Sequence, residues 1–218
     1  MRWNIFSRSR DNQAVRRVYL SSSLILAPGL WYVVFVLTWG NFWIRISLAA
    51  SLLAAVSLTV MGEGRRALLK PRLRHLALGL LSAALLYGVF WMGRAILLLI
   101  YPQARPALAA VYAPRGEISL WAVSLLLFFV TGPCEEIFWR GGVQRLLGRE
   151  AGGVTALLCA ALLYSLVHVW TLNLPLMLAA LVAGLFWGFL FHSERSLVPG
   201  IVSHSVWSVL IFVLLPLM

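Results

Sequence analysis

The sequence predicts an all-α membrane protein, a polytopic transmembrane helical bundle of about seven spans. Hydrophobic residues make up 61% of the 218 residues and charged residues only 11%. That is more apolar surface than a soluble domain of this length can bury. The apolar residues gather in runs of about 20, the length that crosses a bilayer. These runs lack the two-residue alternation of a membrane β-barrel.

We expect a single integral membrane domain, residues 1–218, because no soluble stretch is long enough for a core of its own. Residues 1–19 form a basic segment, predicted to be cytoplasmic, with Arg2, Arg8, Arg10, Arg16 and Arg17. The apolar run that follows has no clear small-residue cleavage site, so it is predicted to be a retained helix. The first span covers about residues 20–39 and the second about residues 42–60.

The third predicted span, about residues 76–100, follows a loop that is crowded with cations: Arg65, Arg66, Lys70, Arg72 and Arg74. Arg45 and Arg94 lie near span ends and are expected to extend to the interface. His75 falls in a predicted loop and is expected to be solvated or to face the lipid headgroups. A linker-like stretch, about 101–117, precedes the fourth span, which starts near residue 118 and continues as a helix to about residue 148.

The last three spans are predicted at about residues 152–171, 174–191 and 197–217. The sixth contains GLFWG, Gly184 to Gly188, a spacing of small residues that is typical of close helix packing. His192 is assigned to the loop after it. Most of the ten tryptophans are expected to serve packing or the membrane interface.

The charge pattern predicts the orientation. Arg145 and Arg149 follow the fourth span and Arg195 follows the sixth, so all the basic segments share one side of the membrane. Because cytoplasmic loops are rich in Lys and Arg, we predict a plasma (bacterial inner) membrane protein with its N-terminus inside and its C-terminus outside. The net charge of +11 comes from these short segments, so the lipid bilayer is an expected partner and nucleic acid is not.

Two adjacent carboxylates interrupt the fourth span in PCEEIFWRG, residues 133–141. Glu136 and Arg140 are four apart and share one side of a helix. A buried carboxylate needs a cation or hydrogen bonds, so Arg140 is expected to pair with Glu136. Glu135 is rotated by about 100° and has no obvious local partner. We therefore expect Glu136 to be structural and Glu135 to act as a general base.

Two histidines lie within later spans, His168 in YSLVHVW and His204 in PGIVSHSVWS. A single histidine in a membrane helix often only bridges two helices. Several ionisable residues in one half of a charge-poor chain point to function instead. Counting about 1.5 Å per residue, Glu135 lies near mid-membrane, His168 farther out and His204 nearer the cytoplasm. Helix tilt or a break at Pro199 is needed to bring them together.

The order of these motifs resembles the CPBP family of intramembrane proteases, which includes CAAX-processing enzymes and bacterial Abi proteins. Its motifs are EExxxR, an aromatic residue four positions before His, and His-xxx-Asn or a similar polar residue. Here they read Glu135 to Arg140, Tyr164 to His168 and His204 to Ser208. The resemblance covers about residues 118–210, with Tyr164 for the usual Phe and Ser208 where Asn is frequent.

The resemblance implies an endopeptidase whose catalytic core is the C-terminal four-helix half, residues 118–217. Its substrate would be a membrane-anchored protein or peptide, cut near an anchored or prenylated C-terminus. Glu135 would activate water with help from His168, His204 and Ser208 would stabilise the oxyanion, and Glu136 and Arg140 would hold the geometry. No cofactor is expected.

Zinc bound by Glu135, His168 and His204 is the alternative to a metal-free site. It is the less favoured one, since the histidines do not share an HExxH helix. A non-catalytic scaffold or bacteriocin-immunity protein also remains open, with Ser208 in its favour, as does a protease of C-terminal sorting signals. A transporter is a further alternative, although the chain shows no paired internal repeats.

Overall fold

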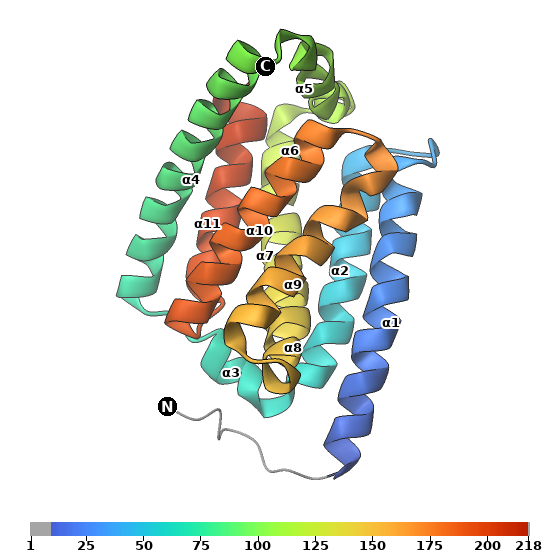
Figure 1. Cartoon of the computed structure of the whole chain (residues 1–218), viewed down its shortest axis with the longest axis vertical. Coiled ribbons are helices and arrows are strands. Elements are labelled where there is room, and N and C mark those ends of the chain that lie inside the picture. The colour runs from blue at the N-terminus through green and yellow to red at the C-terminus, as the bar shows by residue number, and fades with distance from the viewer. Residues whose placement is uncertain (1–9, 218) are drawn as a thin grey trace.

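The computed structural model describes residues 10–217, which form helices packed side by side along a common axis (Figure 1). No strand occurs among these residues, and the predicted all-α membrane bundle is confirmed. The helices are α1 (Arg10–Phe35), α2 (Phe42–Met61), α3 (Arg65–Leu68), α4 (Leu73–Ile100), α5 (Arg105–Val111), α6 (Leu120–Leu126), α7 (Gly132–Glu136), α8 (Arg145–Glu150), α9 (Gly153–Leu166), α10 (Leu174–Glu194) and α11 (Val198–Val209).

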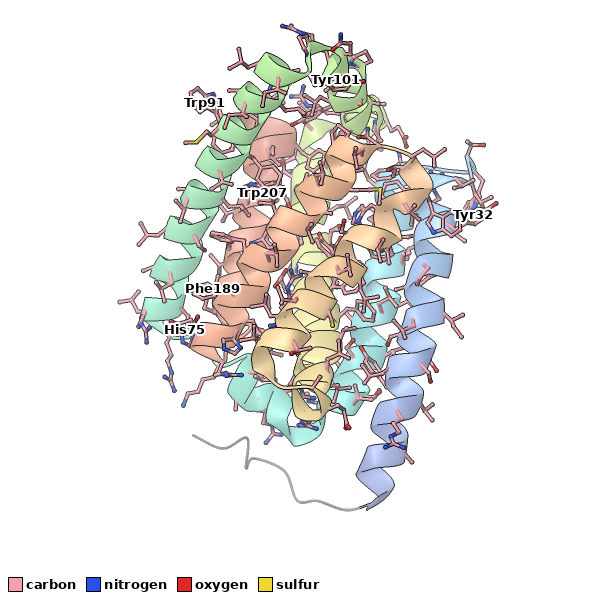
Figure 2. The ribbon with its side chains drawn as sticks, in the orientation of Figure 1. Tyr32, His75, Trp91, Tyr101, Phe189 and Trp207 are labelled. Atoms are coloured by element: carbon pink, nitrogen blue, oxygen red, sulfur yellow. The ribbon has the colours of Figure 1, made fainter. Side chains whose placement is uncertain are left out.

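Within the described residues, six helical stretches are long and apolar enough to cross a membrane. They are Arg17–Phe35, Phe42–Met61, Leu73–Ile100, Leu120–Glu150, Gly153–Thr171 and Leu174–Glu194, and the shorter apolar helix Val198–Leu214 follows. Each corresponds to one predicted span. The outer surface carries large apolar side chains such as Trp91 and Phe189, 58% and 65% exposed (Figure 2). Exposed apolar surface of this extent fits a hydrocarbon environment.

The fourth span is a single continuous helix with two π-helical segments, Leu127–Thr131 and Ile137–Gln144, on either side of α7. The helix lies in the middle of the bundle, between the outer helices α1 and α4 (Figure 1). Wider turns of this kind are frequent at functional sites, since they change the direction in which side chains project. Glu135 and Glu136 are the last two residues of α7, directly before the second π-helical segment.

Helix α11 approaches α7 closely because both contain glycine at the contact. A β-carbon added to Gly132 would lie 2.8 Å from Ser205 Oγ, and one added to Gly200 would lie 2.8 Å from Glu136 Oε2. Real Cβ atoms essentially never come this close to a neighbour. Glycine at these two positions therefore brings α11, which carries His204, against the paired carboxylates.

The start of α1 and the turns α2–α4, α8–α9 and α10–α11 lie at the same end of the bundle (Figure 1). This arrangement collects the basic segments at one end, as the sequence predicts. The basic N-terminal residues 1–9 lie outside the described residues. Arg145, which lies near the end of the predicted helix, is buried in α8, where its Nε donates to the Gly141 carbonyl at 2.9 Å.

His75 and His192 lie in helices and not in the loops predicted for them. His75 is buried at the start of α4, with Nδ1 3.3 Å from Ser196 Oγ (Figure 2). His192 lies in α10, and its ring occupies the space beside Gly153. Arg45, near the start of α2, donates to the carbonyls of Trp39, Gly40 and Val34.

Candidate active site

Glu136 lies at the centre of a buried ionic cluster. Its Oε1 is 3.1 Å from the Arg140 guanidinium and 2.9 Å from His204 Nδ1. The first contact is the i,i+4 pair that the sequence predicts, while the second comes from α11, 68 residues away along the chain. Glu136 and Arg140 are 1% and 2% exposed, so their charges depend on each other.

Arg140 connects this cluster to α9 and α10. It donates to the Gly184 carbonyl at 3.1 Å, and its guanidinium lies 5.2 Å from the ring centre of Tyr164 and 5.6 Å from that of Trp187. Both distances are within the range of cation–π attraction. Arg140 is therefore held by a carboxylate, a carbonyl and two aromatic rings on three different helical segments.

The GLFWG stretch serves helix packing, as its spacing predicts. A β-carbon added to Gly184 would lie 3.1 Å from Ala161 Cα, so the glycine lets α10 approach α9. The same two glycines also present carbonyls to the fourth span: Gly184 accepts from Arg140, and Gly188 accepts from Gln144 at 2.9 Å. Arg140 and Gln144 are four residues apart, as are Gly184 and Gly188, so the two donors of the fourth span face the two carbonyls of α10.

Glu135 has a different environment from its neighbour. The Tyr164 hydroxyl donates to Glu135 Oε2 at 2.9 Å. The main-chain carbonyl of Tyr164 in turn lies 2.8 Å from His168 Nδ1. Because a carbonyl can only accept, Nδ1 carries the proton, and Nε2 is the atom left to accept one in the neutral ring. Tyr164 thus connects Glu135 with His168.

His168 lies in a 3₁₀ turn, Val167–Thr171, and is surrounded by aromatic rings. Ring centres of Tyr164, Phe35 and Trp31 are 5.4, 5.6 and 6.3 Å from its own. Phe35 and Trp31 belong to α1, outside the predicted catalytic core of residues 118–217. No spacing or motif in the sequence marks these two residues, so sequence reasoning missed them.

His204 stacks on Trp187, with ring centres 3.8 Å apart and planes 14° from parallel. Trp187 Nε1 donates to Ser203 Oγ at 3.1 Å, which orients the indole. The sequence does not predict this contact, although the place of Trp187 between Gly184 and Gly188 marks a helix interface. Ser208 is buried one turn beyond His204.

The structure thus brings Arg140 and His204 into contact with the same oxygen of Glu136, and it links Glu135 to His168 through Tyr164. Pro199, where a helix break was expected as one way to bring these groups together, lies in the first turn of α11. Among the described residues, no three His, Cys, Asp or Glu side chains form a group that could hold a metal ion. The alternative zinc ligands Glu135, His168 and His204 therefore do not form such a group here.

Comparison with known proteins gives a match to a family model. Residues 117–210 match the family model described as type II CAAX prenyl endopeptidase, Rce1-like. No curated protein and no solved structure matches the chain. The matched region contains all six predicted site residues, from Glu135 to Ser208. It supports a CAAX-type intramembrane protease, a hydrolase that acts on membrane-associated substrates. Residues 117–210 are thus similar to the Rce1-like CAAX prenyl endopeptidase family, within an integral membrane protein.

Proposed function

We propose that the protein is a glutamic intramembrane endopeptidase in which Glu135 activates the attacking water. The observation that supports this role is the contrast between the adjacent carboxylates. Glu136 is bound by a guanidinium at 3.1 Å and an imidazole at 2.9 Å, whereas Glu135 accepts from the neutral Tyr164 hydroxyl. One hydroxyl uses one of about four lone-pair sites of a carboxylate, so Glu135 can still accept a proton from water.

In the proposed reaction, Glu135 takes a proton from water as the water oxygen bonds to the carbonyl carbon of the scissile peptide. The proton then passes to the amide nitrogen, the C–N bond breaks, and new carboxyl and amino ends result. His168 assists through Nε2, because its Nδ1 is engaged by the Tyr164 carbonyl. These roles require no cofactor.

His204 and Ser208 are assigned to the oxyanion of the tetrahedral intermediate. A carboxylate oxygen accepts, so His204 donates its Nδ1–H to Glu136 at 2.9 Å. His204 can donate to an oxyanion as well when Nε2 also carries a proton. Ser208 supplies a second donor from the same face of α11, one turn away. Glu136 and Arg140 hold His204 in place.

The proposed substrate is a protein or peptide that is cut near a membrane-anchored or prenylated C-terminus. The family match and the location of the site within apolar helices support this class. We also propose that the protein lies in the plasma membrane with its basic end in the cytoplasm, since basic segments mark cytoplasmic loops.

Cleavage of a prenylated reporter peptide by the purified protein in detergent tests the proposal. Glu135→Gln should abolish cleavage and leave the unfolding temperature nearly unchanged, because the amide has the same shape but accepts no proton from water. Glu117→Gln is the matched control, since Glu117 lies outside the site and accepts from the backbone N–H of Phe42. Full activity of Glu135→Gln would refute the proposal, and inactivity of the wild type on prenylated and anchored reporters would favour a scaffold.

The zinc alternative is tested on the same sample. Extensively chelated protein should retain its rate, because the proposed base is a carboxylate. Stoichiometric zinc by elemental analysis, with activity lost on chelation and restored by added zinc, would contradict the metal-free mechanism.

A further inference from the structure

Tyr164 stands where the family that the motifs resemble usually has Phe. The two residues differ by the hydroxyl group. Here that atom is used, since it donates to Glu135 Oε2 at 2.9 Å. Tyr164 is 6% exposed, so water does not compete freely for the hydroxyl. A role for this atom goes beyond the aromatic requirement of the motif.

The ring of Tyr164 is held on several sides. Its centre lies 5.3 Å from that of Trp139 and 5.4 Å from that of His168, both in edge-on arrangements, and the Arg140 guanidinium lies 5.2 Å away. A β-carbon on Gly184 would lie 3.2 Å from Tyr164 Cδ1, so α10 also confines the ring. These contacts fix the direction in which the hydroxyl points.

The carboxylate of a glutamate is otherwise poorly fixed. Its terminal torsion is broad, with no sharp staggered preference. A hydrogen bond to Oε2 sets the plane of the carboxylate and directs the other oxygen, Oε1, at a defined angle. A general base must be within hydrogen-bond reach of the proton that it takes.

We infer that Tyr164 is a positioning residue that orients both groups acting on the water: its hydroxyl fixes the Glu135 carboxylate, and its main-chain carbonyl fixes His168. This inference rests on the proposed function. The two contacts come from one residue, at 2.9 Å and 2.8 Å, so the base and its assisting histidine are held relative to each other. The Nε2 of His168 and the Oε1 of Glu135 are then the two acceptors presented to the water.

Tyr164→Phe tests the inference, because it removes the hydroxyl and retains the ring and the carbonyl. Misplacement of a reacting group by about 1 Å costs up to about a hundredfold in rate. We therefore expect kcat on the reporter peptide to fall about tenfold to a hundredfold, with KM within about twofold of the wild-type value. The unfolding temperature should change little, since the packing contacts of the ring remain.

Tyr19→Phe is the matched control. Tyr19 is 4% exposed and its hydroxyl is 2.7 Å from Ser57 Oγ, so it loses an equally buried hydrogen bond outside the site. Its kcat should stay at the wild-type value. If Tyr164→Phe keeps full kcat while Glu135→Gln is inactive, the positioning role is wrong and the proposed function stands. Equal losses of kcat in Tyr164→Phe and Tyr19→Phe would also refute it, since a purely structural effect would explain both.

Discussion

The two sides of the site, one around Glu136 and the other around Glu135, are built from different interactions. On the Glu136 side, two basic side chains contact a single carboxylate oxygen at 3.1 and 2.9 Å. On the Glu135 side, a phenol and a carbonyl connect the carboxylate with a histidine, and the contacts involve no second formal charge. Charge pairing fixes a framework, whereas in the proposed mechanism neutral hydrogen bonds leave the second carboxylate able to accept a proton.

This contrast predicts that mutations on the Glu136 side mainly change stability and that mutations on the Glu135 side mainly change the reaction rate. Removing one partner of a buried ion pair leaves an uncompensated charge and is strongly destabilising. On the Glu135 side, Glu135→Gln replaces the carboxylate by an amide, which keeps the shape of the side chain but does not accept a proton. The framework side should therefore respond to mutation in the unfolding temperature, and the Glu135 side mainly in the rate.

The largest expected effect comes from Arg140→Ala. It leaves Glu136 buried without its guanidinium and also removes the contact with the Gly184 carbonyl. We expect a loss of about 3–5 kcal/mol in the free energy of unfolding, together with loss of cleavage. Thermal unfolding in detergent measures the first and the reporter peptide the second. A stable Arg140→Ala beside an unfolded Glu135→Gln would reverse the roles of the two sides.

The framework side is also the part of the site that the sequence predicts best. Glu136 and Arg140 are four residues apart, and helix geometry alone brings them together. Likewise, the apolar runs predict every span, because bilayer thickness sets helix length. Contacts within one helix follow from local spacing, so a single sequence is enough to infer them.

Contacts between helices are harder to predict from a single sequence. The partners Tyr164 of Glu135 and Trp187 of His204 depend on how α9, α10 and α11 pack, which no local pattern determines. Trp31 and Phe35 lie in a span whose only visible signal is hydrophobicity. His75 was misplaced for a related reason: a polar residue next to a span end was expected in a loop, and tertiary packing buries it.

A smaller effect is expected from Gly200→Ala, in which the added methyl group crowds Glu136. The new methyl would lie 2.8 Å from Glu136 Oε2, so α11 or the carboxylate must shift. Overpacking of this kind costs about 1–3 kcal/mol. We expect a lower unfolding temperature and a reduced rate, because His204 moves with α11.

Gly88→Ala provides the control for that substitution. A β-carbon on Gly88 meets nothing within 4 Å, and the residue lies inside α4. Alanine is the better helix former by about 1 kcal/mol, so the control should be neutral or stabilising. If both alanine variants behave alike, the close approach of α11 to Glu136 does not limit stability.

The smallest expected effect concerns a second Arg–Glu pair, at the basic end of the bundle. Arg74 donates to Glu194 at 2.7 Å, a shorter distance than the 3.1 Å of the Glu136–Arg140 pair. The Arg74 side chain is 72% exposed, however, and an exposed pair is worth at most about 1 kcal/mol because water and salt screen it. Arg74→Ala should therefore leave cleavage unchanged and shift the free energy of unfolding by less than about 1 kcal/mol. Measuring both arginine variants under the same detergent conditions compares one chemical pair in two environments. Equal destabilisation by the two would show that burial is not what distinguishes the Glu136 side.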